Sequence, residues 1–218
     1  MTTRTTLRRD LADLKEKVYM LGKECLEISD IYNSILDSYS NNFEEKLIEI
    51  SNSVKNESKK LHEQCFLVLT LQQPLIKDLR FVIGTLQIIL NLEKISEQYL
   101  ITLPQLSDIN TLEINLKEKF IKMARSIYDM LKTSITLYLS SNINTQNDII
   151  KTVSEISYLH DVIYKQILKE VAETGGEKAQ IEAQLLNTVR VLEKIADLIL
   201  NLTEQVNYII IGNPKDEK

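Results

Sequence analysis

The chain has 218 residues, a length that permits one large domain or two small ones. It contains only 5 Gly and 3 Pro against 44% hydrophobic and 26% charged residues, and this balance predicts an all-α protein of a few long helices. The net charge is −5, and Lys and Arg are scattered rather than clustered, which argues against a nucleic-acid-binding surface.

The first ten residues lack the apolar core of a signal peptide. The longest uncharged stretch, residues 81–92, is too short to cross a bilayer. Cys25 and Cys65 have no repeated spacing, and we predict two free, buried thiols, as expected in a reducing compartment. These features predict a soluble, cytoplasmic protein with no membrane span.

Apolar residues from Leu7 to Ile35 recur every three or four positions, which predicts a first amphipathic helix. The polar run at residues 38–42 ends it, and a second helix runs from Phe43 to Gln72. Pro74 ends this second helix, because proline has no N–H to donate and restricts the residue before it. A third helix is predicted over residues 75–101.

Pro104 and the polar residues after it mark a hinge, and the second half repeats the plan. Helices are predicted over residues 112–140, 148–172 and 177–211, separated by a polar turn at 141–144 and by the breaker Thr174-Gly175-Gly176. Six long helices with short turns predict two antiparallel three-helix bundles. We place the first domain at residues 1–104 and the second at residues 105–218.

A six-residue phrase supports this duplication: Leu-Glu-Lys-Ile-Ser-Glu at residues 92–97 recurs as Leu-Glu-Lys-Ile-Ala-Asp at residues 192–197. Each copy carries two acids four residues apart, which places both side chains on one helix face at a cost of about 0.2–0.5 kcal/mol for like charges. The candidate site residues are therefore Glu93 with Glu97, and Glu193 with Asp197.

Paired carboxylates suit hard cations or iron, so a metal site is one interpretation of these acids. The other is a solvated charged stripe. Lys94 can reach Glu97, while Arg190 and Lys194 can pair with the acids of the second copy. A carboxylate in the apolar surroundings of Glu93 favours a partner on another helix or a metal ion.

The two histidines, His62 and His160, each fall on the predicted middle helix of a half. If the middle helix packs antiparallel to the third helix of its half, His62 would lie close to Glu93 and His160 close to Glu193. Asp161 follows His160 directly. A helical histidine is more often a surface or core residue than a ligand, so these three are weaker metal candidates. The spacing between these histidines and acids differs from the Glu-x-x-His motif of di-iron bundles.

The sequence contains no phosphate-cradling loop, nucleophile motif or Cys-x-x-Cys pair, so we expect that the protein is not an enzyme.

Three segments resemble the PhoU family, the regulators of bacterial phosphate uptake. Leu-Gln-Gln-Pro-Leu-Ile-Lys-Asp-Leu-Arg at residues 71–80 is similar to the family's Gln-Gln-Pro to Asp-Leu-Arg turn. Its acid motif, Leu-Glu-Arg-Ile-Gly-Asp, is matched at residues 92–97 and again at 192–197. The family's ending is matched at residues 201–212. The resemblance covers nearly the whole chain, in order.

The resemblance implies two pseudo-symmetric three-helix bundles and a non-enzymatic regulator that restrains phosphate uptake and the phosphate-starvation response. The implied partners are the phosphate ABC transporter and a sensor histidine kinase, with any membrane association arising through the transporter, and we also expect a homodimer. Some members bind iron or other metals through the acid motifs, so iron, zinc, magnesium or a similar ion is a candidate cofactor.

The chain departs from the family at several acid positions. Glu97 replaces the family's Asp, and the middle helices carry Ser58 with His62, and Ser157 with Asp161, where the family usually has a second acid pair. These changes favour a single ion or none over a large cluster. Two alternatives stay open: a metal-binding or storage protein, and a helical scaffold with partners unrelated to phosphate. We interpret residues 72–80 as a structural turn rather than a docking surface.

Overall fold

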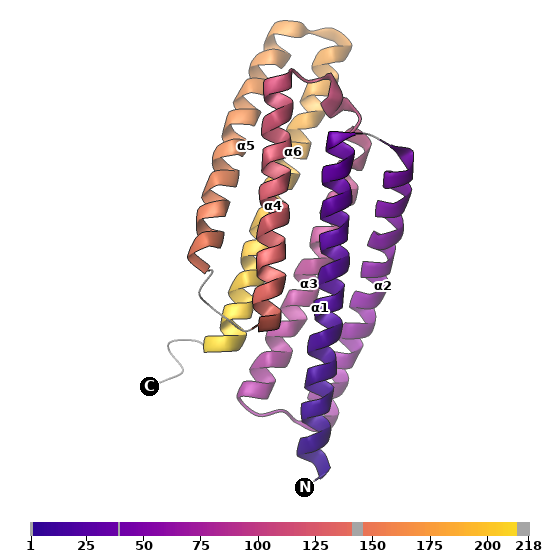
Figure 1. Ribbon diagram of the computed structural model, residues 1–218, viewed down its shortest axis with the longest axis vertical. Coiled ribbons are helices and arrows are strands. Elements are labelled where there is room, and N and C mark those ends of the chain that lie inside the picture. Colours follow the sequence, from indigo (N-terminus) through magenta and orange to yellow (C-terminus); the bar gives the residue numbers. More distant parts are fainter. Residues whose placement is uncertain (1, 39, 141–145, 213–218) are drawn as a thin grey trace.

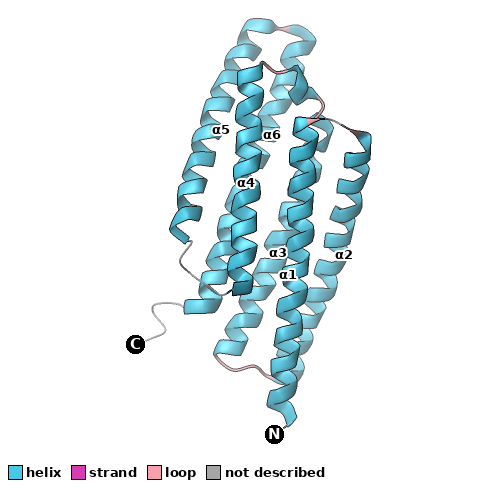
Figure 2. Cartoon of the chain, viewed as in Figure 1, coloured by secondary structure: helices cyan, strands magenta, loops and turns pink. Residues whose placement is uncertain are grey.

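The computed structural model describes residues 2–38, 40–140 and 146–212. The first half contains α1 (Thr2–Asp37), α2 (Asn41–Gln72) and α3 (Lys77–Thr102), and the second contains α4 (Ile114–Ser140), α5 (Gln146–Thr174) and α6 (Gly176–Ile211). Two short 3-10 helices, η1 (Leu103–Gln105) and η2 (Asp108–Thr111), replace the predicted hinge. The described residues form no strand, as Figure 2 also shows, so the all-α prediction is confirmed.

The helices form two antiparallel sets of three, as predicted. α1, α2 and α3 pack together, as do α4, α5 and α6, and the sets meet through α3 against α6 and α1 against α4. In Figure 1 the α2–α3 turn lies beside the start of α1 at one end of the molecule, and the α5–α6 turn lies at the opposite end. None of the described helices contains an apolar segment long enough to cross a membrane.

The buried side chains form a single cluster that spans both halves. On α1 the predicted stripe is buried at Leu14, Val18, Leu21, Cys25 and Ile28. This continuity arises because α3 and α6 each present one face to their own set and another to the opposite set. A domain boundary at residue 104 therefore stays a prediction, since no separate core belongs to either half.

The α2–α3 connection differs from its prediction, because α3 begins at Lys77 and not at residue 75. Gln73 and Ile76 have φ values of 44° and 39°, in the left-handed region, so the chain cannot continue as a right-handed helix between them. Asp78 N–H donates to the Leu75 carbonyl (3.0 Å), which closes the turn before the helix starts.

Two glycines let the halves approach closely. A Cβ on Gly84 of α3 would lie 2.5 Å from Ile209 Cγ1 of α6, and one on Gly22 of α1 would lie 3.0 Å from Ile135 Cγ1 of α4. Real Cβ atoms do not make contacts of 2.5 Å, so the α3–α6 spacing depends on the missing side chain at Gly84.

Hydroxyl pairs bridge the helices inside this core. Ser29 Oγ lies 2.8 Å from the Tyr99 hydroxyl between α1 and α3, and Ser134 Oγ lies 2.8 Å from Thr203 Oγ1 between α4 and α6. Burial raises the pKa of Tyr99 well above its ordinary range, so the phenol is neutral at physiological pH. Such paired buried polar groups specify how neighbouring helices align.

We predict that Gly84→Ala destabilises the protein by about 1–2 kcal/mol, since overpacking outweighs the roughly 1 kcal/mol gained in helix propensity. Ile209→Ala introduced together with Gly84→Ala should cost less than the sum of the two single changes, because it makes room for the methyl group. Urea unfolding measures both effects. Gln87→Ala, at an exposed position of the same helix, is the control, and an equal loss there would contradict the prediction.

Cys25 and Cys65 are free and buried, as predicted. Cys25 Sγ donates to the Leu92 carbonyl at 3.4 Å, and burial raises the pKa of Cys65 to about 12. We predict that neither thiol reacts with a disulfide reagent at pH 8 in the native protein, because the reactive thiolate is absent and access is blocked. Unfolding in urea should release two reactive thiols, and rapid labelling without denaturant would contradict this prediction.

Candidate functional site at the two acid pairs

The acid pairs lie on α3 and α6, the two helices at the centre of the molecule. In each copy the apolar residues on either side of the first acid are buried, and these are Leu92, Ile95, Leu192 and Ile195. Burial of these neighbours fixes the rotation of each helix, so the first acid is half-buried and the second is exposed. The solvated second acids, Glu97 and Asp197, avoid the desolvation cost that an inward carboxylate would have.

The second copy brings its histidine to its acid pair, as the antiparallel return predicts. His160 Nε2 lies 3.4 Å from Glu193 Oε2, and His160 Nδ1 lies 3.3 Å from Asp161 Oδ1. The His160 side chain is 15% exposed and that of Glu193 is 31% exposed. Nε2 has no hydrogen-bond partner, so its contact with Glu193 is electrostatic rather than a directed hydrogen bond. A protonated imidazole here would be flanked by two carboxylates.

Tyr164 and Arg190 complete this cluster. Arg190 Nη2 donates to the Tyr164 hydroxyl at 2.6 Å and its guanidinium lies over the Tyr164 ring at 5.1 Å, while the His160 ring stacks on the same ring at 5.5 Å. The contact recorded for Arg190 is therefore with Tyr164 on α5, and not the predicted pairing with Glu193. The sequence offers no signal for Tyr164, because its role depends on how α5 faces α6.

The first copy lacks the matching contact. His62 is half-buried with Nε2 buried and unpartnered, and no hydrogen bond or ion pair joins it to Glu93 among the residues that the structure describes. The two halves also differ in their connections: four residues, 73–76, join α2 to α3, while Gly175 alone joins α5 to α6. The longer connection changes which residues of the paired helices lie opposite each other.

The predicted metal site needs several donors around one point. In the described parts of the chain, no group of three or more His, Cys, Asp or Glu side chains is placed to hold a metal ion. His160 and Glu193 supply two donors, while Asp161 is 65% exposed and approaches the opposite ring nitrogen. The residues as placed do not fit a preformed metal centre, and a site at these acids stays a prediction.

A polar groove between α1 and α4 was not predicted. It has a volume of about 430 Å³ at the end near Asp37, where Arg125 Nη2 donates to both carboxylate oxygens of Asp37 at 3.0 and 3.1 Å. Asp30, Asp129 and Tyr128 continue the lining toward the middle of the helices. The residues come from both halves of the chain, so the pattern of a single helix cannot reveal them.

The comparisons with known proteins are consistent with this geometry. A family model described as the PhoU domain matches twice, over residues 21–99 and 120–206. The phosphate-specific transport system accessory protein PhoU homolog of Clostridium acetobutylicum is 22% identical over 218 residues, covering 98% of both chains. The homolog of the same description from Pseudomonas aeruginosa is 23% identical over 213 residues, covering 93% of this chain and 84% of its own.

Two crystal structures have the same fold. PhoU from Pseudomonas aeruginosa superposes with a TM-score of 0.82 at 15% identity, covering 94% of this chain and 99% of its own. The phosphate transport system regulatory protein PhoU from Streptococcus pneumoniae has a TM-score of 0.81 at 20% identity, covering 95% of this chain and 98% of its own.

Because no preformed set of donors is present in the described residues, we predict that dialysis against EDTA leaves the melting temperature unchanged. Differential scanning fluorimetry with and without added Fe²⁺ or Zn²⁺ measures this. A melting temperature that falls with EDTA and recovers with metal would contradict the prediction. Loss of that recovery in Glu193→Ala/Asp197→Ala, and not in Glu93→Ala/Glu97→Ala, would place the ion at the second acid pair.

Proposed function

The chain belongs to the PhoU family, and we propose that it is a regulatory accessory protein of phosphate transport. One observation carries this proposal: the family model matches each half of the chain, and each match contains one of the two acid motifs. Full-length relatives named as accessory proteins of the phosphate-specific transport system support it. A match over both halves is more specific than a shared helical fold, because a fold alone does not define a function.

In finer detail, we propose a non-catalytic repressor that lowers high-affinity phosphate uptake and the phosphate-starvation response. The proposed partners are the phosphate ABC transporter and a sensor histidine kinase, and the proposed setting is the cytoplasm, with a homodimer as the working form. The Streptococcus pneumoniae relative is named as a regulatory protein of phosphate transport, and a regulatory role of that kind supports the proposal.

The charged surfaces are suited to partner selection rather than to chemistry. The groove between α1 and α4 contains Asp30, Asp37 and Asp129 together with Arg125, and Glu97 and Asp197 are exposed on α3 and α6. Charges at the rim of an interface steer association and exclude partners of the wrong sign, while adding little affinity. A protein with mixed charge of this kind can bind a partner reversibly.

We predict that deletion of the gene raises phosphate import in phosphate-rich medium several-fold. The expected cause is loss of a contact that restrains the transporter. Uptake of radiolabelled phosphate measures the effect, and a plasmid copy of the wild-type gene should reverse it. A plasmid carrying Asp37→Arg/Arg125→Asp, which swaps the charges of an exposed ion pair without removing it, tests whether the α1–α4 groove contributes.

Equal import in the deletion strain and its parent, at both high and low external phosphate, would contradict the proposed function and favour a helical scaffold with other partners. The charge-swapped variant must first be shown to fold, by circular dichroism and its unfolding midpoint. An exposed pair of this kind contributes about 0–1 kcal/mol to stability, so its unfolding midpoint should change little.

A further inference from the structure

Seven large apolar side chains are exposed together around the α2–α3 turn. Leu71, Leu75 and Ile76 are 71%, 72% and 81% exposed. The others lie on the last turns of α2 and the first turns of α3, and they are Phe66, Leu67, Leu79 and Ile83, with exposures of 61%, 58%, 38% and 42%. We call these seven residues the apolar turn.

The apolar turn is large for a surface feature. Five of the seven side chains are more than half exposed, and a monomer rarely exposes a contiguous apolar patch larger than a few hundred Å² unless it has a function. The corresponding turn of the second half has no equivalent: near the α5–α6 turn, Leu168, at 44%, is the one large apolar side chain that is exposed among the described residues from 164 to 186. The duplicated fold therefore carries this feature once.

The backbone at Ile76 adopts an unfavourable conformation. Ile76 has φ 39° and ψ −90°, a conformation that a β-branched residue adopts at a cost of about 1–3 kcal/mol. At 81% exposure its side chain gains little from the rest of the chain to offset this cost. A strained, exposed, apolar residue is explained if its side chain contacts something outside the molecule.

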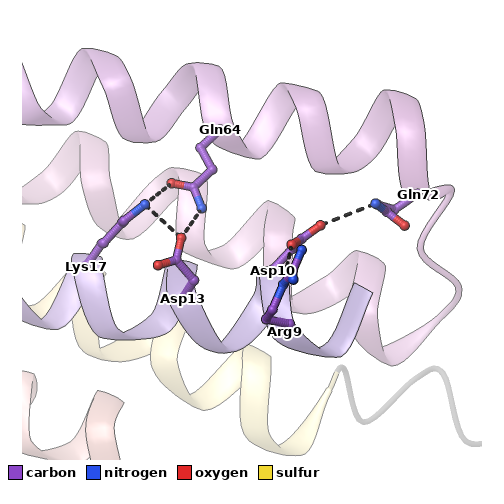
Figure 3. Close-up of polar contacts among 6 residues, drawn as sticks. All are labelled: Arg9, Asp10, Asp13, Lys17, Gln64 and Gln72. Atoms are coloured by element: carbon purple, nitrogen blue, oxygen red, sulfur yellow. Dashed lines mark hydrogen bonds and ion pairs between the residues drawn. The ribbon is translucent and has the colours of Figure 1, made fainter. Parts of the chain in front are cut away.

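The charges at this end differ in sign from those of the whole protein. Residues 4–17 and 57–83, which flank the apolar turn, contain nine Lys and Arg and six Asp and Glu, a net charge of +3 in a chain of −5. The nearby acids of α1 are already partnered, as Figure 3 shows: Asp10 accepts from Gln72 at 3.2 Å and pairs with Arg9, and Asp13 pairs with Lys17 at 2.7 Å. Arg8, Arg9 and Lys77 are exposed around the turn.

Contrary to the expectation that residues 72–80 form a structural turn rather than a docking surface, we propose that this end of the molecule binds the surface of an anionic lipid bilayer. Leu71, Leu75 and Ile76 enter the interfacial layer, and Arg8, Arg9 and Lys77 bind the lipid phosphates. Phe66 lies six residues before the end of α2, about 9 Å along the helix, so the apolar turn extends over about 9 Å of that helix. The anionic surface repels the acidic remainder of the chain. The helix axes are therefore oriented close to the membrane normal.

Composition favours lipid over a protein groove. Protein interfaces are depleted in Lys, and their strongest contacts are enriched in Trp, Tyr and Arg, whereas Leu is under-represented. The apolar turn is aliphatic apart from Phe66, and Lys and Arg surround it, as in segments that enter an anionic interface. Docking into a protein groove is the competing outcome. The proposal does not rest on the regulatory function, because purified protein alone tests it.

The natural absence of Trp gives a direct reporter. Leu75→Trp places a single Trp in the apolar turn, and Leu168→Trp places one at the opposite end as a matched control. We expect vesicles of phosphatidylcholine with phosphatidylglycerol to shift Trp emission to the blue for Leu75→Trp and not for Leu168→Trp. Vesicles of phosphatidylcholine alone should give a smaller shift, and high salt should weaken it.

Vesicle sedimentation of the otherwise wild-type chain gives the second measurement. Ile76→Glu should weaken binding about tenfold or more, as expected for losing one large apolar side chain from the interface, while Leu168→Glu should leave it unchanged. Arg8→Glu/Arg9→Glu should also weaken binding and should reduce its salt dependence. These exposed positions are chosen so that folding is retained, which circular dichroism verifies.

The proposal is wrong if neither Trp variant shifts, if both shift equally, or if sedimentation does not respond to Ile76→Glu. It is also wrong if wild-type protein fails to bind vesicles while Ile76→Glu removes repression of phosphate import in cells, because the turn then docks into a protein. Vesicle binding in a protein whose deletion leaves phosphate import unchanged would support the lipid contact and contradict the regulatory function separately.

Discussion

The close packing of α3 against α6 is the constraint on which the rest of the molecule depends. Gly84 lets the two helices approach until Ile209 occupies the space that a side chain would take. This contact joins the two sets of helices into one core, and it fixes the rotation of the helices that carry both acid motifs. The exposure of Glu97 and Asp197 is therefore a consequence of apolar packing on the opposite faces of their helices.

The duplicated motif has two different environments, and the connections around it differ as well. Four residues lie between α2 and α3 and one lies between α5 and α6; His160 reaches Glu193, while His62 Nε2 has no hydrogen-bond partner among the described residues. The longer connection also creates the exposed residues Leu75 and Ile76. The two halves share the same arrangement of three helices, but their turns differ, so the two halves expose different residues.

The α1–α4 groove and the apolar turn have different roles in the function that we propose. Mixed charge in the α1–α4 groove is suited to selecting a soluble partner, since charge affects specificity and association rate more than affinity. The apolar turn is suited to holding the molecule at a membrane surface, where a transporter would be within reach. Restricting a protein to a membrane raises its effective concentration near partners there, so modest contacts become sufficient.

The sequence by itself determined the six helices, their order and the buried stripe of α1, because apolar periodicity and helix-ending residues such as Pro74 act locally. It also predicted the approach of His160 to Glu193, since an antiparallel return follows from a short turn. Only the tertiary structure decided that Arg190 bonds to Tyr164, that His62 Nε2 has no hydrogen-bond partner among the described residues, and that the Gln-Gln-Pro turn exposes Ile76. Each of these depends on the alignment and facing of two helices, which the periodicity of one helix does not specify.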